Sequence, residues 1–110
     1  MRNEPLELLP GTLDLLILKA VNRGPLHGYA IMQILKEQSD EVLQVGESSL
    51  YPALQRLLLQ GWIEGEWSRT QDNRRARYYR VTRAGRKQLD AEIERYQRVA
   101  AAIGKILQPA

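Results

Sequence analysis

Three stretches in the first two thirds of the chain carry apolar residues at helical spacing. Residues 10–24 have so few polar positions that they predict a first helix buried on nearly every side. Residues 24–40 turn into a second helix, and residues 48–60 predict a third, short one that Gly61 ends. Pro52 is compatible with a helix only in the first turn, so the third helix is expected to begin just before it.

Shorter segments with the alternation of β-strands separate and follow these helices. Residues 41–45, "EVLQV", predict a short strand, and residues 62–67, "WIEGEW", predict another. The next residues are polar, and Asp72-Asn73 suits the tip of a turn. Residues 77–81, "RYYRV", then predict the returning strand of a hairpin.

A long helix is expected at the C-terminal end, capped by Thr82 and running to about Gln108. Its apolar positions follow a heptad pattern over nearly three repeats: Leu89, Ile93, Tyr96, Ala100, Ile103 and Leu107. At 1.5 Å per residue such a helix spans nearly 40 Å, more than a body this small needs. We therefore predict that it packs against a second copy of the chain; the alternative is that the stripe packs only on its own domain.

The order of these elements is helix, helix, short strand, helix, two-stranded ribbon and helix. It predicts a mainly α (α+β) fold, a winged helix-turn-helix with a C-terminal dimerisation helix. The expected division is a flexible N-terminal lead at residues 1–9, a winged-helix domain at 10–82 and the dimerisation helix at 83–108.

Charge is distributed unevenly along the 110 residues. Between Ser68 and Lys87 there are seven arginines and one lysine against a single acid, Asp72, so this segment carries +7 in a chain whose net charge is +3. A basic segment on an otherwise acidic body indicates a polyanion site, and arginine suits bidentate contact with phosphate. The alternative is a solvated charged loop.

Composition argues against several other classes. The chain has no cysteine and one histidine, and its pattern includes neither a phosphate-binding glycine loop nor a metal-ligand cluster. We therefore expect no enzyme activity, no cofactor and no metal. No apolar run approaches a membrane span and the N-terminus does not resemble a signal peptide, so a cytoplasmic protein without membrane contact is expected.

Three ordered motifs resemble the PadR family of bacterial transcriptional regulators. They are "GPLHGYAI" at 24–31, "SLYPALQRLLLQGWI" at 49–63 and "RRARYYRVTRAGRKQL" at 74–89. The short C-terminal end is similar to the subgroup with a single C-terminal helix. The resemblance implies a winged-helix DNA-binding domain and a homodimer built through the last helix. It also implies a usually repressive action and, in some members, a response to phenolic acids or other small aromatic or cationic compounds.

In this setting the third helix is the recognition helix, whose first turn offers unpaired backbone N–H groups and a positive dipole end. Its candidate DNA-binding residues are Ser48, Ser49, Tyr51, Pro52, Gln55 and Arg56. The serine and tyrosine hydroxyls suit phosphates or base edges, whereas Gln55 suits adenine and Arg56 suits guanine. The family's "LYP"-like motif singles out Tyr51. Tyr51 could instead be a core aromatic, and Gln55 and Arg56 could simply be solvated.

On the hairpin, Arg74, Arg75 and Arg77 are candidates for following a phosphate backbone or entering a minor groove. Further cations lie at the start of the last helix, where they oppose the helix dipole by roughly 0.3–1 kcal/mol each. Nearby phosphates would favour them there, although chance placement is the rival explanation.

The sequence thus predicts a DNA-binding transcriptional regulator, a repressor that binds a pseudo-palindromic operator as a homodimer. The runner-up is a dimeric protein-interaction module with a basic surface and no DNA target. A small aromatic effector could bind at the dimer interface, in a pocket lined by tryptophan or by Tyr96.

Overall fold

Helix α1 (Pro10–Val21) lies at the centre of the helical body and contacts each of the other helices. The computed structural model describes residues 8 and 10–109, so the predicted lead at 1–9 falls, except for residue 8, outside the described residues. As its sequence predicts, α1 is buried on most sides, and Ile17 and Leu18 are among the least exposed side chains. Each such side chain contributes about 1.5–3 kcal/mol by leaving water.

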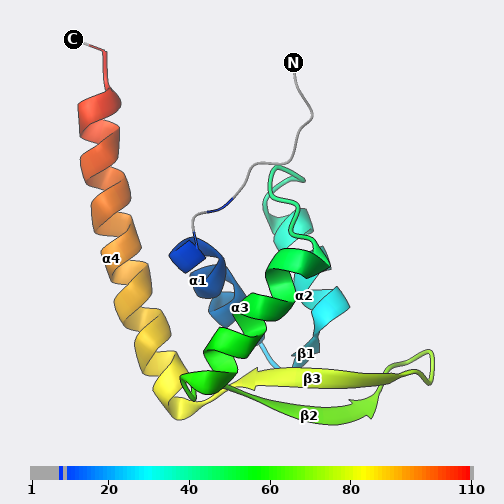
Figure 1. Cartoon of the computed structure of the whole chain (residues 1–110). Helices are drawn as coiled ribbons and strands as arrows, with labels where there is room; N and C mark the ends of the chain where they lie inside the picture. The colour runs from blue at the N-terminus through cyan, green and yellow to red at the C-terminus, as the bar shows by residue number, and fades with distance from the viewer. Residues whose placement is uncertain (1–7, 9, 110) are drawn as a thin grey trace.

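Helices α2 (Gly28–Gln38) and α3 (Glu47–Leu59) pack with α1 around one apolar core (Figure 1). Residues 41–45, predicted to form a strand, are not a strand in the structure. Asp40 and Glu41 both have positive φ angles, 52° and 66°, which turn the chain sharply. The strand prediction was wrong because the alternating apolar residues belong to a turn and its following loop. Val45 packs on the core there, while Val42 stays half exposed.

A three-stranded antiparallel sheet with strand order β1-β3-β2 closes one side of this body. Strand β1 (Leu26–His27) pairs with β3 (Arg75–Val81), and β3 pairs with β2 (Ile63–Arg69) from Ile63↔Val81 to Arg69↔Arg75. The two-residue β1 was not predicted, because so short a run shows no alternation. Strands β2 and β3 extend past the helices as the wing of a winged helix, and confirm the predicted fold (Figure 1).

Helix α3 begins earlier than predicted. Its N-cap is Gly46, which has no side chain to form a capping bond, and not Ser48 or Ser49. Pro52 therefore lies in the second turn and removes the backbone hydrogen bond to the carbonyl of Ser48. The loss is tolerated because Ser48 is exposed and water can bind its carbonyl oxygen.

The end of α3 is as predicted. Gly61 has a φ of 75°, and the N–H groups of Gly61 and Trp62 donate to the carbonyls of Leu58 and Leu57 at 3.0 and 3.1 Å. This is the Schellman arrangement, which satisfies the last carbonyls of a helix and needs a left-handed residue. It sends the chain directly from α3 into β2.

The wing turns without glycine or proline. Asn73, predicted at the tip, has a φ of 61° and donates its N–H to the carbonyl of Thr70 at 2.9 Å. The hydroxyl of Thr70 accepts a bond from the N–H of Arg74 at 3.2 Å. Asparagine tolerates the left-handed conformation better than most residues, so it fills the place of a glycine.

Helix α4 (Arg83–Leu107) begins at a tightly bonded joint with the wing. The hydroxyl of Thr82, its N-cap, accepts from the N–H of Gly85 at 3.0 Å and donates to the carbonyl of Gly61 at 2.7 Å. The N–H of Thr82 donates to the carbonyl of Trp62 at 2.9 Å, and a Cβ at Gly85 would collide with that same carbonyl. The first half of α4 lies along α1, and its second half projects clear of the body (Figure 1).

Candidate nucleic-acid interface

Helix α3 presents an exposed polar face opposite the side that enters the core. Leu50, Ala53, Leu54 and Leu57 are buried, which fixes the rotation of the helix. At 100° per residue, Ser48, Pro52 and Gln55 then fall on the opposite, solvent-exposed side. Leu59, 82% exposed, continues this face into the last turn. Three predicted DNA-binding residues thus share one accessible surface.

Ser48 and Ser49 do not cap α3, so their hydroxyls remain available to a ligand. Neither hydroxyl bonds to another residue within the described part of the chain. The N–H groups of Ser49 and Leu50 bond to the carbonyl of Gly46 at 3.2 and 3.0 Å. Glu47 in the first turn opposes an anion there, so the serine hydroxyls and the more distant cations have to outweigh it.

Tyr51 is neither fully buried nor free of the body. Its side chain is 47% exposed, and it leans toward the start of α2. A Cβ at Gly28 would lie 3.0 Å from the Tyr51 hydroxyl, so the absence of a side chain at Gly28 makes room for it. The ring is therefore positioned by packing while its edge stays accessible.

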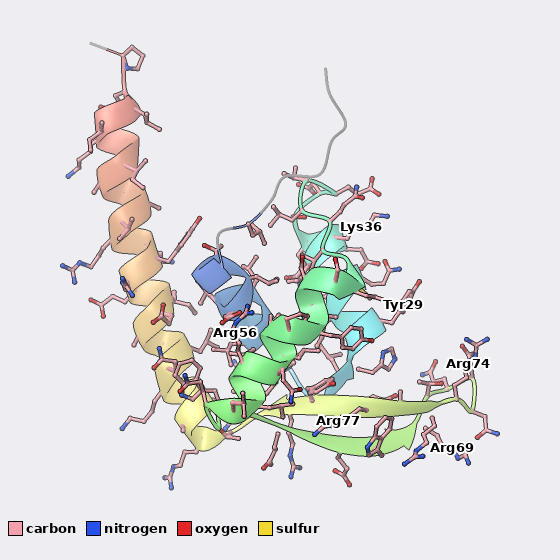
Figure 2. The ribbon with its side chains drawn as sticks, in the orientation of Figure 1. Tyr29, Lys36, Arg56, Arg69, Arg74 and Arg77 are labelled. Carbon is pink, nitrogen blue, oxygen red and sulfur yellow. The ribbon has the colours of Figure 1, made fainter. Side chains whose placement is uncertain are left out.

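Arg56 lies on the other flank of α3 and is held by Asp14 of α1. Its Nη2 donates to Asp14 Oδ1 at 2.8 Å and its Nε donates to Oδ2 at 3.3 Å. The hydrogen bond to Asp14 raises the pKa of Arg56. Figure 2 shows the Arg56 side chain on the α1 side of α3. The position favours a role in fixing α3 against α1 over the predicted reading of guanine.

The three wing arginines predicted to bind DNA lie in three different settings. Arg74 is exposed at the tip, whereas the guanidinium of Arg75 lies 4.6 Å from the centre of the Trp67 ring. Arg77 lies nearer the root of the wing, 5.6 Å from the ring of Tyr79 (Figure 2). Within residues 10–109, no carboxylate forms an ion pair with any of the three. Their charge is therefore available to an anion.

Tyr79 lies beneath the guanidinium of Arg77. Burial raises the pKa of its hydroxyl above the ordinary value of 10.0, and the nearby cation of Arg77 only partly opposes this. The phenol consequently stays neutral at physiological pH and leaves the local charge positive.

An open groove of about 1120 Å³ separates the wing from the start of α2. Tyr51 contributes to one wall, and Arg74, Arg75 and Arg77 contribute to the other. His27 lies between them: its Nδ1 accepts from the N–H of Ala30 at 3.2 Å and so caps α2. His27 is thus a structural residue.

Sequence reasoning missed three aromatic residues of this groove. Trp67 and Tyr78 line it from the wing and Tyr29, 63% exposed, lines it from α2. Tyr78 meets the ring of His27 edge-on at 5.2 Å because β1 pairs with β3. This contact could be predicted only by predicting strand β1, and a two-residue strand is too short to be recognised in a sequence.

The predicted dimerisation stripe of α4 divides into two parts. Leu89 is buried in the chain's own core and Ile93 is partly buried against it, so these two positions mainly hold α4 to the body. Leu89 is therefore withdrawn from the surface available to a partner. The distal part remains exposed and includes positions outside the heptad pattern: Tyr96, Val99, Ala100, Ile103, Ile106 and Leu107.

The fold and this groove define the class of protein as a winged-helix protein with a basic wing. A sequence model of the transcriptional regulator PadR-like family matches residues 17–91, more than half of the chain. The chain belongs to this family.

Two solved structures and one curated protein illustrate what the chain is similar to. A transcriptional regulator from Clostridium thermocellum is 28% identical, with a TM-score of 0.81 over 89% of this chain and 95% of that one. A PadR family transcriptional regulator from Eggerthella lenta is 28% identical, with a TM-score of 0.77 over 91% of this chain and 85% of that one. A protein of Lysinibacillus sphaericus is 26% identical over 102 residues, which are 93% of this chain and 94% of the relative.

The family assignment makes the chain a transcriptional regulator and not an enzyme. Across residues 8 and 10–109, no three or more metal-ligand side chains gather in one place. The same part of the chain has no helix that is both long and apolar enough to cross a membrane.

Proposed function

We propose that this protein is a repressor that binds a pseudo-palindromic operator in double-stranded DNA as a homodimer. One observation carries the proposal: Tyr51 of α3 and the unpaired arginines of the wing, Arg74, Arg75 and Arg77, line the same groove. In this arrangement α3 enters the major groove, where Ser48, Ser49 and Gln55 reach base edges or phosphates. The wing follows the adjacent backbone with Arg74, Arg75 and Arg77.

A second basic cluster lies at the start of α4, next to the base of the wing. Arg83, Arg86 and Lys87 are exposed, and the first turn of α4 has no acidic residue. Cations there oppose the helix dipole, so a phosphate within reach would offset an unfavourable interaction. Its proximity to the wing through Thr82 supports this assignment.

Homodimerisation is proposed through the distal part of α4. Its exposed apolar side chains, Tyr96, Val99, Ile103, Ile106 and Leu107, are more than a solvated helix usually displays. A second copy of α4 covers them by coiled-coil packing, with Ala100 allowing close approach. The two α3 helices then meet successive major grooves about 34–36 Å apart. A small aromatic effector would bind at this seam, near Tyr96, and the protein would act in the cytoplasm.

Fluorescence anisotropy with a labelled duplex tests the DNA-binding part. Fragments selected from a random duplex pool supply the operator, and their symmetry and spacing report on the dimer. Sub-micromolar binding that weakens steeply with salt supports the proposal, because released counterions dominate protein–DNA affinity. A chain that dimerises yet ignores duplex DNA at low salt is instead a protein-interaction module, and a reporter gene behind the selected operator distinguishes repression from activation.

A further inference from the structure

Gly65 on β2 lies under the side chain of Arg77 on β3. The two strands pair Gly65 with Tyr79 and Trp67 with Arg77, so Arg77 is a diagonal neighbour of the glycine. A Cβ at Gly65 would collide with Nε of Arg77 and lie 3.0 Å from its Cζ and Nη2. The arginine side chain therefore occupies the space that any other residue at position 65 would fill.

The backbone of Gly65 gives no other reason for a glycine. The positive φ angles of glycine in the described chain occur at Gly24 and Gly61, not at Gly65. Position 65 pairs regularly within the ladder, where glycine weakens a strand and often marks a close approach of another group. The group that approaches closely here is the guanidinium of Arg77. The absence of a side chain at position 65 therefore serves to make room for it.

Arg77 is held in place but has no anionic partner. Its guanidinium lies 5.6 Å from the ring centre of Tyr79, which is buried and so a fixed support. By contrast, Arg80 on the same strand is paired with Glu64 at 2.7 Å and Arg56 is paired with Asp14. No described acidic side chain pairs with Arg77, although it lines the groove. Its orientation is thus set by Gly65 and Tyr79, and its charge is left for a ligand.

We propose that Gly65 is a positioning residue that keeps the guanidinium of Arg77 preset in the groove for a phosphodiester oxygen. This inference rests on the proposed DNA binding and adds which arginine is preorganised and what holds it. A guanidinium fixed before binding loses less side-chain entropy when it meets the phosphate. Arg74 at the exposed tip has no comparable support, so its contact is expected to contribute less affinity.

The test is a cycle of Gly65→Ala, Arg77→Ala and the double variant, titrated with the selected operator over a series of salt concentrations. Alanine displaces only the end of a flexible side chain, so Gly65→Ala is expected to fold and to melt at or above the wild-type temperature. Losing one charge-assisted bond per chain is expected to weaken operator binding by roughly ten-fold or more in both single variants. The salt slope falls by about 0.9 for each chain bound.

The double variant decides between positioning and a general effect on the wing. Gly65→Ala should add little once Arg77 is alanine, because the group that it displaces is gone. Gly11→Ala is the matched control, since a Cβ there meets nothing within 4 Å, and it should bind like wild type.

Gly65→Ala that binds like wild type overturns the inference, as does an equal loss in both backgrounds. If Gly65→Ala does not fold, Arg77→Ala tests the inference by itself. An unchanged salt slope in Arg77→Ala overturns the inference, because it shows that Arg77 contacts no phosphate. A wild-type chain that binds no duplex refutes the proposed function itself, which the first titration of the series shows separately.

Discussion

Both carboxylate oxygens of Asp14 on α1 accept hydrogen bonds from the guanidinium of Arg56 on α3, at 2.8 and 3.3 Å. The two residues are 42 positions apart in the sequence. Since α1 also packs along α4, this ion pair connects the helix proposed to read DNA with the body that supports the proposed dimer helix. A bidentate ion pair fixes the orientation of the arginine side chain as well as neutralising its charge.

Replacing Arg56 by methionine should affect stability more than DNA binding. Methionine matches arginine in helix propensity, so the change removes mainly the ion pair. The pair is partly exposed, and we expect a loss of about 0.5–1 kcal/mol in the free energy of unfolding, measured in urea. Asp14→Asn should cost a similar amount and add little in the double variant. Loss of guanine selectivity in Arg56→Met, with stability unchanged, would restore the base-reading role predicted from the sequence.

Tyr51→Phe isolates the hydroxyl from the ring. The ring still packs beside Gly28, so the melting temperature should stay close to that of wild type. Operator affinity should fall by roughly ten-fold if the hydroxyl donates to a phosphate, as bonds to charged groups contribute about 1.5–3 kcal/mol. Full affinity in Tyr51→Phe would assign the residue to packing alone.

Truncating Arg74 and Arg75 together to alanine should weaken binding to every duplex, specific or not. Each lost phosphate contact should lower the slope of log K against log salt by about 0.9. Arg95 and Arg98, also exposed but on α4, provide a control pair with the same change in charge. An unaltered slope in the wing variant would show that the tip does not contact the DNA backbone.

Ile103→Asp should separate the proposed dimer. Ile103 is 49% exposed in the single chain, and an aspartate there would place two charges inside the seam. We expect the self-association constant to weaken by on the order of 100-fold, a typical effect at the centre of an interface. Sedimentation should then report a species near 12.6 kDa. Gln97→Asp, off the apolar stripe, should remain a dimer; a wild-type chain already at 12.6 kDa would refute the interface.

The sequence predicted the winged helix because strong periodicity and special residues agree at its main elements. Gly61 and Thr82 mark helix boundaries whose geometry needs those residue types, and both are confirmed. The start of α3 was misplaced because Ser48 is a better capping residue than Gly46 in isolation. Local preference gave way there to the packing of Leu50 and Leu54 on the core.

The candidate interface was less accessible to sequence reasoning. Spacing along α3 places Arg56 near the polar face, but only the fold brings Asp14 within reach of it. Leu89 fits the heptad pattern, yet it is the contact of α4 with its own body. The support of Arg77 by Gly65 depends on strand register, which a hairpin sequence alone did not specify.

The junction at Thr82 and Gly85 connects the wing rigidly to α4. The hydroxyl and the N–H of Thr82 donate to the carbonyls of Gly61 and Trp62, and together with the close fit at Gly85 these bonds make the wing and α4 move as one rigid unit. In the proposed dimer, each winged-helix domain is thus joined rigidly to its α4 helix, without a flexible hinge between them. One base pair inserted between half-sites rotates them by roughly 35° about the duplex axis, since a turn takes 10–10.5 base pairs. The proposed dimer is therefore expected to discriminate operators by spacer length as well as by sequence.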